Sequence, residues 1–204
     1  TVGILWLAGA YHVDSVAGIA QVPSILAAGL AAALVSATVE ELIARGVLFR
    51  IMERSIGSWG AIAISALLFG LAHLGNPHAS LAVAVGLALQ AGTLLAAAFM
   101  VTRRLWLPIG LHFGWNFIQA ALFGGALSGG TVHSLLEPRL TGPDWLCGGA
   151  FGVEGSVIAT LVCAGAAIAL LTFTVRRGRT LAPFWRDQAR AGLDPAHAPA
   201  AAPA

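Results

Sequence analysis

The chain has 204 residues, of which 58% are hydrophobic and only 10% are charged. A soluble domain carries roughly 25% charged residues, so this composition excludes an ordinary soluble protein. It predicts an all-α fold, a polytopic transmembrane helical bundle with about five to six membrane helices. The net charge of +2 comes with arginines in short runs between apolar segments, which indicates membrane orientation rather than nucleic-acid binding.

Five long apolar runs follow a short apolar segment at residues 1–12 and a break near His12. They cover residues 24–53, 58–75, 79–102, 105–123 and 152–175. Asn76-Pro77 ends the second run, because proline disfavours helix in the residue before it. A glycine-rich connection at 125–150 separates the fourth run from the fifth. These runs predict one membrane-embedded domain over residues 1–188, followed by a disordered Ala/Pro-rich tail at 189–204.

The basic residues give the orientation of the runs. Arginines lie at 50–54, 103–104 and 176–179, whereas the ends near 75–79 and 125–150 are poor in them. If the runs alternate in direction, all three basic ends lie on one side, and the positive-inside rule makes that side cytoplasmic. The chain starts at Thr1 without a visible signal peptide, and we expect further membrane helices upstream of it.

Three polar clusters interrupt the apolar runs. They are Glu40-Glu41 with Arg45, Phe69 with His73, and His112 with Asn116. Burying ionisable groups in hydrocarbon costs several kcal/mol unless they are paired, solvated or neutralised. A carboxylate pair, two imidazoles and a carboxamide on three membrane helices therefore predict a site for acid–base or metal chemistry.

The two adjacent glutamates cannot share one helix face, because neighbouring helical residues point about 100° apart. Glu41 and Arg45 have the i,i+4 spacing of an ion pair, which leaves Glu40 free to face a cavity. The alternative is that both glutamates are structural and bond neighbouring helices.

The histidine clusters also allow a structural interpretation. His112 and Asn116 share one helix face and could converge on a single atom, or they could form a hydrogen-bond ladder between helices. His73, one turn after Phe69, could be a packing residue. Several other polar residues are assigned no chemistry: Gln90 and Gln119, the cysteines Cys147 and Cys163, and His12, His78, His133 and His197.

These motifs resemble those of the CPBP family, the intramembrane CAAX prenyl endopeptidases and bacteriocin-processing or immunity proteins that are similar to the Ras-converting enzyme. The resemblance covers residues 34–162, and the segments 65–73 and 105–112 are also typical of bacterial members. Residues 151–156, Phe-Gly-Val-Glu-Gly-Ser, resemble a segment of one bacterial subgroup. One departure is Ala44, where many members have phenylalanine, and we expect it to affect packing rather than chemistry.

The resemblance implies a role for each matching residue. Glu40 would be the general base that activates water, assisted by His73. His112 and Asn116 would form the oxyanion site. Structural support would come from Glu41, Arg45 and Phe69.

The resemblance further implies an endopeptidase in the bacterial inner membrane. Its partners would be the lipid bilayer and a peptide or protein substrate, prenylated or not, that arrives from the membrane or the cytoplasmic side. We favour a mechanism without a cofactor. The alternative is a divalent metal such as zinc held by Glu40, His73 and His112, although no HExxH helix is present.

Two further functions stay open. The first is a non-proteolytic membrane protein, either a peptide or bacteriocin immunity factor or a proton-relay carrier that uses Glu40, His73 and His112. The second is a b-type haem protein with His73 and His112 as axial ligands, which leaves Glu40 and Asn116 without a role.

Overall fold

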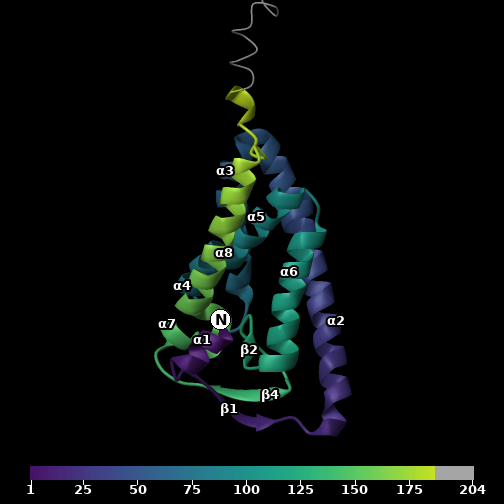
Figure 1. Cartoon of the computed structure of the whole chain (residues 1–204), viewed down its shortest axis with the longest axis vertical. Coiled ribbons are helices and arrows are strands. Elements are labelled where there is room, and N and C mark those ends of the chain that lie inside the picture. Colours follow the sequence, from purple (N-terminus) through teal and green to yellow (C-terminus); the bar gives the residue numbers. More distant parts are fainter. Residues whose placement is uncertain (187–204) are drawn as a thin grey trace, which may run out of the picture.

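The computed structural model describes residues 1–186, so the expected tail at 189–204 and the domain boundary at 188 lie outside them. The described chain is mostly helical (Figure 1). Its α-helices are α1 (Val2–Leu7), α2 (Val22–Glu41), α3 (Arg50–Ala72), α4 (Leu81–Leu87), α5 (Thr93–Thr102), α6 (Trp106–Phe117), α7 (Asp144–Cys147) and α8 (Val157–Arg176). Its π-helical segments are η2 (Leu42–Phe49), η4 (Ala88–Gly92) and η5 (Ile118–Phe123), and its 3-10 segments are η1 (Ile19–Gln21), η3 (His73–Gly75), η6 (Gly149–Phe151) and η7 (Val153–Gly155).

Each expected apolar run lies on a helix. The π-helical segments continue the α-helices without a break, so α4, η4 and α5 form one helix, as do α6 and η5. The expected run at 152–175 begins too early, because residues before Val157 form the short segment η7. Ser156 caps α8 by accepting a hydrogen bond from the amide of Ala159, and this cap sets where the helix starts.

Gly57 divides the longest helical stretch into two arms. α2, η2 and the first turns of α3 form one arm, and the rest of α3 turns back from it (Figure 1). The φ of Gly57 is 77°, a left-handed conformation that glycine adopts at little cost. The turn packs tightly on the chain after α8, since a Cβ on Gly57 would lie 2.8 Å from the nitrogen of Pro183.

The prediction of a purely α-helical fold misses four short strands. β1 (Tyr11–Val16) pairs antiparallel with β4 (Leu136–Leu140), and β2 (Ala126–Leu127) pairs with β3 (Gly130–Thr131). The first pair joins segments about 120 residues apart. Local sequence patterns do not predict a contact between segments so distant in the chain. This pair covers one end of the bundle together with α1 (Figure 1).

Tyr11 ties this sheet to the helices. Its hydroxyl donates to the carbonyl oxygen of Phe123 at 2.6 Å, at the end of η5. Burial raises the pKa of the Tyr11 phenol, which keeps this donor protonated well into the alkaline range. The sheet therefore has a fixed position under the helix that carries His112 and Asn116.

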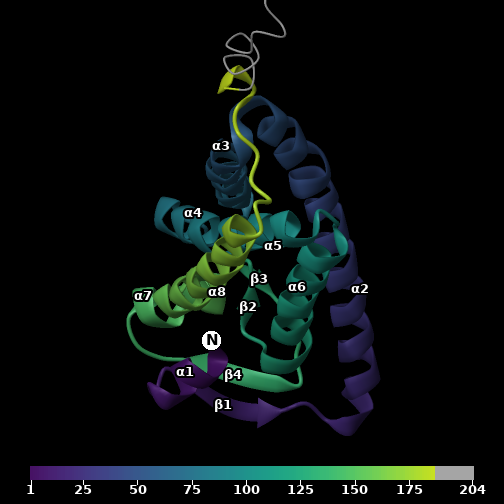
Figure 2. The same ribbon diagram turned by 45° about the horizontal axis from the view of Figure 1, so that its top comes forward.

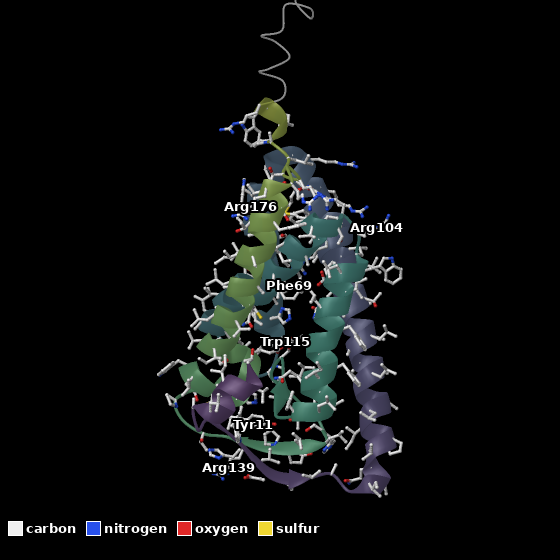
Figure 3. All side chains as sticks on the ribbon, in the orientation of Figure 1. Tyr11, Phe69, Arg104, Trp115, Arg139 and Arg176 are labelled. Carbon is white, nitrogen blue, oxygen red and sulfur yellow. The ribbon has the colours of Figure 1, made fainter. Side chains whose placement is uncertain are left out.

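The three arginine-rich ends meet at the opposite end of the bundle. Arg103 forms an ion pair with Glu53 and donates to the carbonyl of Arg179, and Arg179 donates to the carbonyl of Val101. Figure 3 shows Arg104 and Arg176 at this end and Arg139 at the other. The three basic ends thus lie together at one end of the bundle.

The distribution of apolar side chains is that of a membrane protein. Three helical stretches of the described residues are long and apolar enough to cross a membrane: Ile19–Gly75, Leu81–Thr102 and Val157–Arg176. The interior of the bundle contains many alanines, among them Ala37, Ala61 and Ala97, while large residues such as Val35 and Leu161 are exposed. Small residues inside let helices approach closely, and large apolar residues outside suit contact with lipid.

Candidate active site

A cavity of about 570 Å³ lies within the bundle, and all three polar clusters contribute to its wall. Its polar lining comprises Glu40, His73, Gln90, His112, Trp115, Asn116, Gln119, Ser128 and Glu154. Its apolar lining includes Leu87, Leu94, Leu95, Leu111, Phe123, Val162 and Ala166. The structure thus brings the three polar clusters, which span 76 positions from Glu40 to Asn116, around one space of this volume.

Glu40 lies between the two histidines. Its Oε2 atom is 4.0 Å from Nε2 of His73 and 3.9 Å from Nε2 of His112. The Glu40 side chain is 37% exposed, whereas that of Glu41 is fully buried. The two glutamates therefore face different surroundings, as their helical spacing predicts, and Glu40 is the carboxylate that faces the cavity.

The hydrogen bonds of the histidines determine which ring nitrogen faces Glu40. Nδ1 of His73 lies 2.7 Å from the carbonyl oxygen of Phe69, and Nδ1 of His112 lies 3.0 Å from Oε1 of Glu41. A carbonyl or carboxylate oxygen can only accept, so each Nδ1 carries the hydrogen and donates it. Each Nε2 is thereby directed at Glu40 and is available for proton transfer.

Glu41 and Arg45 form a fully buried ion pair. Nη1 of Arg45 donates to Oε1 of Glu41 at 2.8 Å, and Nη2 donates to the carbonyl of Gly92 at 2.9 Å. The guanidinium carbon also lies 4.7 Å from the centre of the Phe69 ring, a cation–π contact. The pair thus connects α2 to α3 and η4, which accounts for the presence of Phe69 in the motif.

Asn116 has a partner that the sequence analysis missed. Its Nδ2 donates to Oγ of Ser36 at 3.0 Å, and Asn116 and His112 both lie on the cavity wall. Ser36 precedes Glu40 by four residues, so both side chains lie along the same face of α2. That spacing is the signal in the sequence that could have identified Ser36. One face of α2 thus contacts the residues that α6 contributes.

π-helical turns adjoin each part of this arrangement. η2 starts directly after Glu41 and contains Arg45, η4 supplies the carbonyl that Arg45 binds, and η5 starts two residues after Asn116. Such wide turns are rare and occur frequently at functional sites. Close helix packing accompanies them, since a Cβ on Gly92 would lie 2.8 Å from Cα of Ala66. A larger residue at position 92 would push η4 away from α3.

A second polar group lies in the same cavity, and the sequence analysis gave it no role. The buried carboxylate of Glu154 accepts a hydrogen bond from Nε1 of Trp115 at 2.7 Å. Its other oxygen accepts from the backbone N–H of Ser128 at 2.7 Å and from the Ser128 hydroxyl at 2.8 Å. Nε2 of Gln90 donates to the backbone carbonyl of Glu154 at 2.7 Å. Glu154 belongs to the segment 151–156, whose distinctive sequence was the available signal.

The described residues contain no group of three His, Cys, Asp or Glu side chains arranged to hold a metal ion. Zinc ligands lie about 2.0–2.2 Å from the metal, which puts the ligand atoms about 3.3 Å apart in a tetrahedral site. The separations from Glu40 Oε2 to the two histidine nitrogens, 4.0 and 3.9 Å, are wider than that. At these separations one water molecule could bond to two of the three side chains.

Comparison with known proteins gives one family match. The family model described as type II CAAX prenyl endopeptidase Rce1-like matches residues 22–118. Over these residues, 97 of the 204 in the chain, the sequence is similar to this family of intramembrane proteases. No curated protein and no solved structure matches the chain significantly.

The matched region contains all three motifs, from Glu40 to Asn116, and ends before Ser128 and Glu154. The family match and the three apolar helical stretches together indicate an integral membrane protein.

Proposed function

We propose that this chain is an intramembrane endopeptidase that hydrolyses a peptide bond near the C-terminus of a membrane-associated protein or peptide, prenylated or not. The observation that carries this proposal is the placement of Oε2 of Glu40 within 4.0 Å of Nε2 of His73 and 3.9 Å of Nε2 of His112, on the wall of one cavity. At these separations a water molecule can bond to the carboxylate and to one imidazole at once.

In the proposed reaction Glu40 takes a proton from this water while His73 holds the water in place. The resulting hydroxide attacks the carbonyl carbon of the scissile peptide bond, and the carbonyl oxygen becomes an oxyanion. Glu40 then gives its proton to the leaving nitrogen as the C–N bond breaks. One water is consumed, and the products are a new carboxyl terminus and a free amine.

His112 and Asn116 would stabilise the oxyanion. Asn116 uses one of its two amide hydrogens on Ser36 and keeps the other for the substrate. The His112 ring is held through Nδ1 by Glu41, and in its doubly protonated form it would donate to the oxyanion through Nε2. Donors fixed before the reaction are worth several kcal/mol in the transition state. The proposal uses no metal.

The proposal places the arginine-rich end of the bundle in the cytoplasm of a bacterial cell, with five helical passes through the inner membrane. The meeting of Arg103, Arg179 and Glu53 at one end supports this orientation, because basic residues are retained on the cytoplasmic side. A substrate would then reach the cavity from the membrane or from the cytoplasmic side.

One observation also suits a proton-relay carrier: the same spacing of Glu40 between two imidazoles could pass protons along. This second function gives Asn116 no part in the chemistry. It predicts pH-dependent flux that survives Asn116→Ala, whereas the protease predicts slower turnover in that variant.

The test uses the purified chain in lipid nanodiscs with an internally quenched farnesylated peptide and its unprenylated twin. We expect the wild type to cleave at least one of the two and Glu40→Gln to abolish turnover while the protein stays folded. Glu137→Gln, which changes a glutamate on β4 away from this cavity, is the matched control and should cleave normally. Near-normal turnover by Glu40→Gln, or no cleavage of either peptide by the wild type, would overturn the proposal.

A further inference from the structure

Glu154 is a buried carboxylate that the proposed chemistry does not use. It is 5% exposed, and each of its oxygens is engaged: one by Trp115 and the other by the N–H and hydroxyl of Ser128. Ser128 itself has a φ of 49°, which is unusual for a residue other than glycine. The carboxylate therefore holds a strained turn in place, and the turn in return fixes the carboxylate.

Through its hydrogen bond to Glu154, Trp115 links this fixed turn to α6, the helix that contains His112 and Asn116. It directly precedes Asn116 and follows His112 by three residues, so its side chain leaves the helix about 100° from Asn116 and about 60° from His112. His112 and Asn116 bond to α2 through Glu41 and Ser36, whereas Trp115 bonds to η7. Helix α6 is thus held from two sides, and these bonds together determine its rotation about its own axis.

The same contacts form a closed chain of polar interactions around the site. His112 bonds to Glu41, Glu41 bonds to Arg45, and Arg45 bonds to the backbone of η4. Within η4, the side chain of Gln90 bonds to the backbone of Glu154. The carboxylate of Glu154 accepts from Trp115, which lies on α6 with His112. Figure 3 shows Phe69 and Trp115 in the middle of the molecule, between the two polar ends. In Figure 2 the hairpin β2–β3, whose turn contains Ser128, lies between α6 and α8. The circuit joins α2, η2, η4, η7 and α6, and the bond from Trp115 to Glu154 closes it.

We propose that Glu154 is a positioning residue for peptide hydrolysis: through Trp115 it sets the rotation of α6 and so directs His112 and Asn116 at the oxyanion. This inference rests on the proposed function. It extends the site beyond the three motifs to a residue outside the region that matches the family.

A loss of this contact should appear in kcat. Oxyanion donors act in the transition state, so a small rotation of α6 weakens catalysis while substrate binding along the apolar wall persists. A misplacement of about 1 Å can cost up to a hundredfold in rate. Glu154→Gln and Trp115→Phe should therefore each lower kcat about ten- to a hundredfold and leave KM within about twofold.

The experiment measures kcat and KM with the cleaved quenched peptide for wild type, Glu154→Gln, Trp115→Phe and the double variant. Because both changes disrupt the same Trp115–Glu154–Ser128 contact, the double variant should be no slower than the slower single variant. Trp59→Phe is the matched control, since Trp59 is 57% exposed and lies away from the cavity. Trp115→Phe removes the indole N–H donor and keeps an aromatic ring at this position, so it decides the question even where Glu154→Gln lowers the yield of folded protein.

Unchanged kcat in Trp115→Phe, or multiplied losses in the double variant, would overturn the positioning role. A lower melting temperature with normal kcat would also overturn it and leave Glu154 a purely structural residue. Turnover by Glu40→Gln would overturn the proposed function itself. If Glu40→Gln shows no turnover while Trp115→Phe has a normal kcat, only the positioning role is overturned.

Discussion

His112 donates from Nδ1 to Oε1 of Glu41 at 3.0 Å, and that same oxygen accepts from Arg45 at 2.8 Å. The two neighbouring glutamates of the first motif therefore act on the same histidine from different sides. Glu41 fixes the ring through Nδ1, and Glu40 faces Nε2 at 3.9 Å. The adjacency of the two residues in sequence gives the site one buried, paired carboxylate and one that faces the cavity.

Removal of the Arg45 charge should destabilise the fold severely. Both Arg45 and Glu41 are fully buried, and breaking a buried pair from one side leaves an uncompensated charge, which costs about 3–5 kcal/mol. We expect Arg45→Met to lower the stability in detergent by about this amount. The double variant Arg45→Met with Glu41→Gln should recover part of the loss. Unfolding followed by circular dichroism measures both.

Arg139→Met is the matched control for this prediction. Arg139 pairs with Asp14, but the two side chains are 61% and 50% exposed, and exposed ion pairs contribute about 0–1 kcal/mol. Similar losses for Arg45→Met and Arg139→Met would show that the buried pair is not the stabilising feature inferred here.

Asn116→Ala should slow turnover without weakening substrate binding. The loss of one preorganised oxyanion donor costs roughly a hundred- to a thousandfold in kcat. Ser36→Ala should have a smaller effect of the same kind, because Asn116 keeps its amide but loses the 3.0 Å contact that orients it. Steady-state kinetics on the quenched peptide separates kcat from KM. Equal kcat in wild type and Asn116→Ala would instead favour the proton-relay carrier.

The spacing within each helix was enough to predict much of this arrangement. The i,i+4 relation of Glu41 to Arg45 predicts their ion pair, and the i,i+4 relation of His112 to Asn116 predicts a shared face. Apolar runs of membrane length predict the long helices, because their composition is far from that of soluble proteins. All of these signals are local in sequence.

What depends on contacts between distant segments was not predictable. β1 and β4 pair across more than 100 residues, and the apolar–polar alternation in each covers only four or five residues, which is too short to identify a strand or its partner. The role of Glu154 depends on its contacts with Trp115 and Ser128, which precede it by 39 and 26 residues in the chain. The break at Gly57 lies in the gap between the expected runs 24–53 and 58–75, but its close contact with Pro183 could not be predicted from the sequence.

Removal of divalent metal should leave activity unchanged. The 4.0 and 3.9 Å separations around Glu40 Oε2 suit a bridging water and are too wide for shared zinc ligation. We expect protein treated with 1,10-phenanthroline and then dialysed to retain turnover within about twofold, and elemental analysis to find far less than one zinc per chain. One tightly held zinc per chain, with activity lost on its removal and restored on its return, would establish the metal mechanism instead.

Cysteine labelling in oriented vesicles should place the arginine-rich end in the cytoplasm. Arg104 and Arg139 lie at opposite ends of the bundle (Figure 3), and both native cysteines are buried, at 3% and 5% exposure, so their background labelling should be low. A membrane-impermeant maleimide should label Arg104→Cys in inverted inner-membrane vesicles and Arg139→Cys in spheroplasts. The reverse pattern would invert the topology and direct the cavity to the other face of the membrane. Labelling of both cysteines from one side would contradict helices that cross the bilayer between these two ends.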